Sequence, residues 1–166
     1  LLHLEEVQFN DYFAKQRVKG IMPRGEFAEV CAQSIRADVL AFKEKIKDYS
    51  SPHSESVDFV VEMAQGNIRL FGYMEPLFGD EHQIIEWRFA KYKERYRIRP
   101  WLYYLIQLAT KENALPPRII AKDKDLTLKT IEKSTALEKL KMYVEAYLQS
   151  QQQIQLIPTG NIAKFI

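Results

Sequence analysis

The chain has 166 residues, enough for one domain with a buried core, and its 46% hydrophobic and 28% charged residues exclude a wholly disordered protein. A net charge of +2 is too small to indicate any partner, and the single cysteine, Cys31, excludes an internal disulfide. No apolar run approaches the roughly 20 residues that span a bilayer, and no signal-peptide pattern is present, so we expect a cytoplasmic protein with no membrane association.

The first third of the chain predicts one long helix after a segment with no clear pattern. Residues 1–20 fit an edge strand or an approach segment, followed by a short helix or a loop. Over Glu26–Ile46 apolar residues recur every three or four positions, which predicts a helix with Cys31 on its apolar side as a small core residue. The polar segment 50–56 contains a proline and ends this helix. The apolar positions of the helix are Phe27, Val30, Cys31, Ile35, Val39, Phe42 and Ile46.

Three short β-strands are predicted next. Val57–Met63 and Ile68–Glu75 alternate apolar and polar residues, and Gln83–Phe89 follows as a third strand. Turns with glycine at 64–67 and 79–81 separate the strands. Because connections this short join antiparallel neighbours, the three strands are predicted to form an antiparallel meander.

The second half predicts two helices and one or two further strands. Pro100 suits the first residue of an apolar helix, Arg118–Ala121 is a fourth strand, and residues 126–133 are a candidate fifth. Thr135 followed by Glu138 is a capping-box pattern, which predicts the start of the last helix.

The resulting order is helix, three meander strands, helix, strand, helix, which describes an α/β fold with a mixed sheet flanked by helices. No repeat and no long linker divides the chain, so we expect a single domain over residues 1–166. The chain begins at Leu1 with no initiator methionine, which favours a C-terminal fragment of a larger subunit.

Two carboxylates and one arginine are the candidates for phosphodiester chemistry. Metal-dependent cleavage needs acidic groups that converge on Mg²⁺ and a lysine near the attacking water. Glu75 ends the second predicted strand, and Glu86 and Arg88 share one face of the third. Arginine cannot easily exchange a proton as lysine does, so an ion pair between Glu86 and Arg88 is favoured over an active metal site.

The remaining motifs exclude several other sites. His3, His53 and His82 are scattered without the spacing of a zinc site, and no glycine-rich phosphate loop is present. We therefore expect no metal and no cofactor.

A basic run at 88–99 carries six lysine or arginine residues against one acid, Glu94. If this segment is extended, its alternating cations lie on one face, and a basic groove with interleaved rings is typical of single-stranded nucleic acid binding. A solvated loop, or one that docks on an acidic partner, is the alternative. The candidate nucleic-acid-binding residues are Lys91, Tyr92, Lys93, Arg95, Tyr96, Arg97 and Arg99.

Three stretches carry a family resemblance. They are "GIMPRGEFAEVCAQSI", "IRLFGYMEPLFGDEHQIIEWRFAKYKERYRIRPWLYYLIQLA" and "ALEKLKMYVEAYLQSQQQIQLIPTG". In this order, from about Gly20 to Gly160, they resemble the C-terminal domain of the exodeoxyribonuclease V gamma chain, the RecC-type subunit. The Gln-rich segment after the last helix departs from the family, which usually has a Pro, Leu and Phe cluster there.

The resemblance implies a particular core and a lost active site. The family's C-terminal domain has the fold of PD-(D/E)xK nucleases without their catalytic set. Carried over by position, Glu75 takes the first acidic position, Glu86 the second, and Arg88 the lysine position. On this interpretation the domain has no catalytic residues.

The resemblance also implies partners. The gamma chain joins a beta and an alpha chain in a helicase-nuclease that uses ATP to process DNA at double-strand ends, and it handles the separated strands in recombinational repair. We therefore expect a non-catalytic DNA-handling and scaffolding domain that contacts DNA and the beta and alpha subunits. The alternatives are an active Mg²⁺-dependent nuclease, in which Lys91 or Lys93 replaces the missing lysine, and a protein-interaction module without DNA binding.

Overall fold

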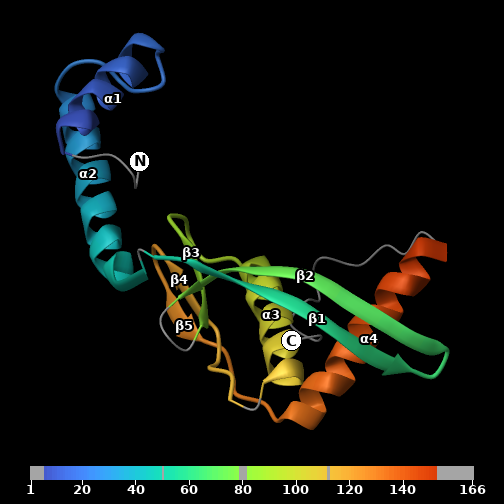
Figure 1. Cartoon of the computed structure of the whole chain (residues 1–166). Coiled ribbons are helices and arrows are strands. Elements are labelled where there is room, and N and C mark those ends of the chain that lie inside the picture. The colour runs from blue at the N-terminus through green and yellow to red at the C-terminus, as the bar shows by residue number, and fades with distance from the viewer. Residues whose placement is uncertain (1–5, 50, 79–81, 112, 153–166) are drawn as a thin grey trace. The chain divides into compact units, whose positions relative to one another are not determined.

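The computed structural model describes most of the chain, and Figure 1 gives the labels used below. The described residues are 6–49, 51–78, 82–111 and 113–152. The chain divides into two compact units, Leu1–Asp48 and Tyr49–Ile166, and each is described by itself.

The described part of the first unit contains the α-helices α1 (Glu6–Val18) and α2 (Glu26–Ile46). Arg17 donates to Glu29 at 2.6 Å and so links α1 to α2. The edge strand that the sequence allowed near the N-terminus is therefore wrong from Glu6 onward, because the chain is helical there. Residues 1–5, on which the same prediction falls, lie outside the described residues.

The bounds predicted for α2 are confirmed, but its buried face is shifted from the predicted one. Val39 and Phe42 are buried as predicted, whereas Phe27 and Val30 are exposed. Small residues, Ala28 and Ala32, are buried in their place. Cys31 is only partly buried, so its placement in the core is not confirmed in full.

The second unit contains a five-stranded sheet with the order β1-β2-β3-β4-β5. Neighbouring strands are antiparallel except for β3 and β4, which are parallel, so the predicted meander and the mixed α/β sheet are both confirmed. The strands are β1 (His53–Met63), β2 (Gly66–Phe78), β3 (Gln83–Arg88), β4 (Arg118–Ala121) and β5 (Asp125–Thr127). The helices of this unit are α3 (Ile98–Thr110) and α4 (Lys133–Gln152).

Several element boundaries differ from the prediction. β1 begins at His53, inside the polar segment expected to be a loop, because that segment pairs with the end of β2. β5 is shorter than the stretch 126–133. The helical hydrogen bonds of α4 begin with Ala136 donating to the Glu132 carbonyl at 2.9 Å, so the start predicted from Thr135 lies inside the helix.

One hydrophobic core joins the sheet to α3 and α4. Val57 and Val61 of β1 are buried as the alternation predicted, and they cluster with apolar residues of α3 and α4. Figure 1 shows both helices on the same side of the β1–β2 hairpin. The other side of the hairpin is exposed, with Phe71 and Tyr73 facing solvent. Within the described residues, no helix is both long and apolar enough to span a bilayer.

Candidate nucleic-acid interface

Glu86 is a buried carboxylate on the face of β3 that α3 covers. It is 4% exposed and is paired in the sheet with Ile119 of β4, a core residue. Arg88 Nε donates to Oε1 of Glu86 at 2.7 Å, which is the ion pair predicted from the i, i+2 spacing. Arg99 of α3 binds the other oxygen, with Nε donating to Oε2 at 3.0 Å and Nη2 donating to the same atom. Both oxygens of this carboxylate are therefore occupied by guanidinium groups.

The two arginines differ from Glu86 in exposure. The side chains of Arg88 and Arg99 are 52% and 48% exposed, whereas that of Glu86 is 5% exposed. A buried charge is tolerated only when it is paired and hydrogen-bonded, and here the pairing holds two guanidinium groups at the surface. Because there are two cations for one anion, this cluster carries a net positive charge.

Glu75, the other predicted acid, does not join this cluster. It is an exposed residue of β2 at a register shift, where His53 pairs with Leu77 and Glu55 with Met74. No group of three or more His, Cys, Asp or Glu side chains among the described residues could hold a metal ion. The assignment of Glu75, Glu86 and Arg88 as remnants of a nuclease site stays a prediction.

The basic run is helical from Glu94 onward, so the extended, one-faced arrangement is wrong for that part of the run. A 3-10 helix covers Glu94–Arg97 and continues into α3 at Ile98. The helix begins at Ile98, so the prediction that Pro100 is its first residue is wrong by two positions. Pro100 still lies in the first turn, where a proline is tolerated because its missing N–H has no intrahelical partner. Arg97 is the least exposed cation of the run and is paired with Glu94 at 3.1 Å.

The rings of this run are covered by cations. The Cζ atoms of Arg88 and Arg95 lie 5.8 and 5.7 Å from the centre of the Tyr96 ring, and Lys124 Nζ lies 4.4 Å from that of Tyr92. Both tyrosines are partly buried and pack against the hydrophobic core. Burial, followed by the neighbouring Glu94 carboxylate, raises the pKa of Tyr92, so this ring stays neutral at physiological pH.

The loop between β4 and β5 adds two lysines that the sequence reasoning did not select. Lys122 N donates to the Ala90 carbonyl at 3.0 Å, and Asp123 accepts a hydrogen bond from Tyr92 N at 2.7 Å. Lys122 and Lys124 are both exposed. No local pattern marks these lysines, since only the parallel pairing of β3 with β4 brings this loop to the basic run.

These residues form one basic surface, which we define as residues 86–99 together with 121–124. It holds eight lysine or arginine side chains and three carboxylates, a net charge of +5. The whole chain has a net charge of only +2, so positive charge is concentrated here. Concentrated positive charge of this kind attracts polyanions such as nucleic acid.

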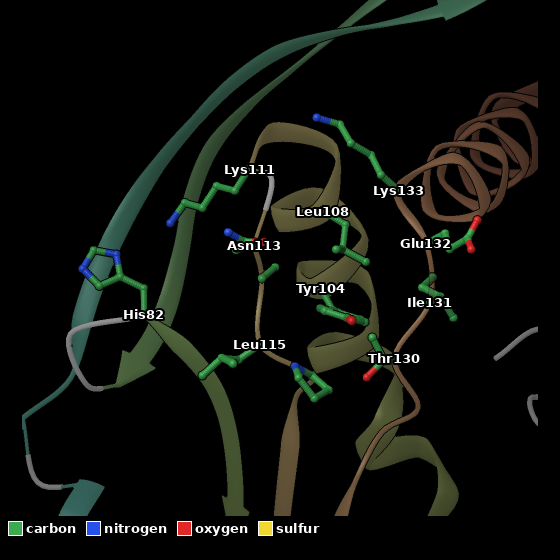
Figure 2. Close-up of a pocket in the computed structure, with 12 residues that line it drawn as sticks. His82, Tyr104, Leu108, Lys111, Asn113, Leu115, Thr130, Ile131, Glu132 and Lys133 are labelled. Atoms are coloured by element: carbon green, nitrogen blue, oxygen red, sulfur yellow. The ribbon is translucent and has the colours of Figure 1, made fainter.

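A separate pocket of about 820 Å³ lies between the loop after α3 and the segment before α4. Figure 2 shows Lys111 and Asn113 on one side of the opening and Thr130 on the other, with α3 between them. At its edge Lys111 donates to Glu55 at 2.7 Å. Burial acts to raise the pKa of Glu55, but the hydrogen bonds from Lys111 and His82 outweigh it and leave that pKa lowered. This acid is therefore held as an anion in an ion pair and is not suited to act as a general acid.

A comparison with protein families decides which family this fold represents. A family model described as the RecC C-terminal domain matches residues 1–165. The chain belongs to the RecC C-terminal domain family. The resemblance inferred from the order of the sequence motifs is thereby confirmed, and the match covers both compact units of this RecC C-terminal domain.

A curated relative gives the same family. The RecBCD enzyme subunit RecC of Haemophilus influenzae is 53% identical to this RecC C-terminal domain over 171 residues. The match covers 100% of the chain and 15% of that relative, so this RecC C-terminal domain corresponds to a small part of the relative's length.

Proposed function

We propose that this RecC C-terminal domain is a non-catalytic DNA-handling and scaffolding domain of a helicase-nuclease. The observation that carries the proposal is the Glu86 carboxylate, whose two oxygens accept hydrogen bonds from Arg88 and Arg99 beside a surface of net charge +5. A carboxylate that binds a catalytic metal needs an oxygen directed at the ion. Here both oxygens serve to hold cations at the surface, which suits binding of DNA phosphates.

The fold supports an origin in the PD-(D/E)xK nucleases. A helix, α2, precedes the β1–β3 meander, and α3 and β4 follow it, which is the order of elements that this core requires. On this proposal Glu75 and Glu86 stand at the former acidic positions and Arg88 at the former lysine position. The replacement of lysine by arginine then removes the group that assists the attacking water, because arginine stays protonated.

The partners follow from the family. The relative's printed name makes it a subunit of the RecBCD enzyme. We extend this to the present chain and propose that it works beside the beta and alpha subunits of such an enzyme in the cytoplasm, on double-strand ends and separated strands. The exposed aromatic side of the β1–β2 hairpin shares no residue with the basic surface, and we propose it as the part that contacts other subunits.

A cleavage and binding assay tests the proposed function. The purified chain is incubated with end-labelled single- and double-stranded DNA in Mg²⁺, Mn²⁺ or chelator, and binding is measured at low and at high salt. We expect intact DNA in every condition and binding that weakens steeply with salt. Metal-dependent cleavage that disappears in Glu86→Gln would make this an active nuclease. Absence of DNA binding even at low salt would favour a protein-interaction module.

A further inference from the structure

Two rings of the basic surface, those of Tyr92 and Tyr96, have little room for a nucleobase. Stacking needs an open ring face, but Tyr96 lies beneath Arg88 and Arg95, and Tyr92 lies beneath Lys124. The same two tyrosines pack against the hydrophobic core. Each of these two rings therefore contacts both the core and a cation, which leaves less of its surface open to a base.

The cations, in contrast, are held in place with their charged groups at the surface. Glu86 anchors Arg88 and Arg99 through hydrogen bonds to its two oxygens, and the side chains of both arginines remain about half exposed. A guanidinium has five N–H donors, so an arginine that uses one or two of them on a carboxylate retains others for a second anion. Phosphate oxygens match the geometry of these donors.

The β4–β5 loop adds two more cations, Lys122 and Lys124, to this surface. Lys122 Nζ lies 5.6 Å from the centre of the Phe89 ring, and Lys124 Nζ lies over Tyr92. The hydrogen bonds from Tyr92 N to Asp123 and from Lys122 N to Ala90 tie the loop to the run. The two lysines therefore belong to one surface with the arginines, and the rings serve as supports that position the cations.

We propose that this surface binds the sugar-phosphate backbone of DNA without stacking on bases, and that Lys122 and Lys124 are part of the binding site. The proposal rests on the proposed DNA-handling function and names the part of the ligand that the surface recognises. Arg88 and Arg99 contact phosphates, and Glu86 is a positioning residue that acts through them. Such a site follows a strand whatever its sequence, because phosphates carry no base information.

The test compares an ordinary oligodeoxythymidine with an oligomer of the same length in which every base is replaced by an abasic tetrahydrofuran unit. Binding of both to the 166-residue chain is measured by fluorescence anisotropy at several salt concentrations. We expect affinities within about threefold of each other, because removal of a base that makes no stacking contact costs little. Lys122→Ala with Lys124→Ala should weaken both oligomers by a similar factor of about ten and lower the salt slope by about one.

The outcomes separate the two proposals. Binding of oligodeoxythymidine with at least about tenfold weaker binding of the abasic oligomer overturns backbone recognition and leaves DNA handling intact. Failure of both oligomers to bind at low salt overturns both proposals. An unchanged affinity in the Lys122 and Lys124 variant removes the β4–β5 loop from the site. The matched control, Lys129→Ala with Lys133→Ala, removes two exposed lysines outside the basic surface and should weaken binding much less.

Discussion

Glu86 on β3 accepts hydrogen bonds from Arg99 at the start of α3, thirteen residues further along the chain. This contact ties the end of the sheet to the helix that covers it, and it lies at the edge of the hydrophobic core. The same carboxylate binds Arg88, so one buried anion organises two exposed cations. The Glu86 side chain therefore contributes both to the packing of α3 on the sheet and to the placement of surface charge.

Glu86→Gln should lower the free energy of unfolding. The amide keeps the shape of the side chain but loses the charge that both arginines share. Because the arginines are half exposed and can turn toward water, we expect a loss of about 1–3 kcal/mol, below the cost of stranding a fully buried charge. Urea unfolding, followed by circular dichroism, measures the unfolding free energy of the variant and of the unaltered chain. Glu75→Gln, at an exposed position of β2, is the matched control and should change stability by less than about 0.5 kcal/mol.

Replacement of Lys91, Lys93 and Arg95 together by alanine should weaken DNA binding about ten- to a hundredfold at low salt. These three side chains are exposed. Each neutralised phosphate of single-stranded DNA contributes about 0.7 to the slope of log affinity against log salt, so removal of three cations should reduce the slope by about two. Arg97 is left in place because its ion pair with Glu94 contributes to the 3-10 helix. Unaltered affinity and slope in this variant would contradict a DNA contact at the basic run.

The ion pair between Glu55 and Lys111 should make stability depend on pH. The pKa of Glu55 is lowered from its ordinary value of 4.5, so the unfolded chain takes up a proton before the folded chain does. The pair therefore stabilises the fold above about pH 5, and this contribution disappears as the pH falls through the folded-state pKa. Lys111→Met should reduce the unfolding free energy at pH 7 by about 1 kcal/mol.

The measurement for this pair is chemical denaturation of both proteins at pH 7 and at pH 3. The difference between Lys111→Met and the unaltered chain should be smaller at pH 3 than at pH 7, because the attraction between Glu55 and the ammonium group is lost as the pH falls through the lowered pKa of Glu55. A difference of equal size at both pH values would show that Lys111 stabilises the fold by packing alone.

Tyr104→Phe should leave the fold as stable as before or make it more stable by about 1 kcal/mol. The side chain is 0% exposed, and within the described residues its hydroxyl has no hydrogen-bond partner, so its removal relieves the cost of a buried polar group. Thermal unfolding compares this variant with Tyr147→Phe, at a 64% exposed position, which should be neutral. A loss of more than about 1 kcal/mol in Tyr104→Phe would mean that the hydroxyl makes a hydrogen bond in solution.

The sequence by itself determined the features that depend on neighbours along the chain. Alternation placed Val57 and Val61 on the buried face of β1, short turns joined the meander, and the i, i+2 spacing put Glu86 beside Arg88. Periodicity also indicated the bounds of α2. The order of these motifs was sufficient to identify the family, because spacing along the chain is a property of the sequence alone.

The tertiary structure decided every feature that depends on contacts between distant segments. Pairing of β3 with β4 brings Lys122 and Lys124 to the basic run, and packing of α3 against the sheet brings Arg99 to Glu86. Tertiary packing also decided that Phe27 is exposed. Local sequence patterns do not predict such contacts. The free energy that favours these contacts comes from burial and charge pairing between segments that meet only in the folded chain.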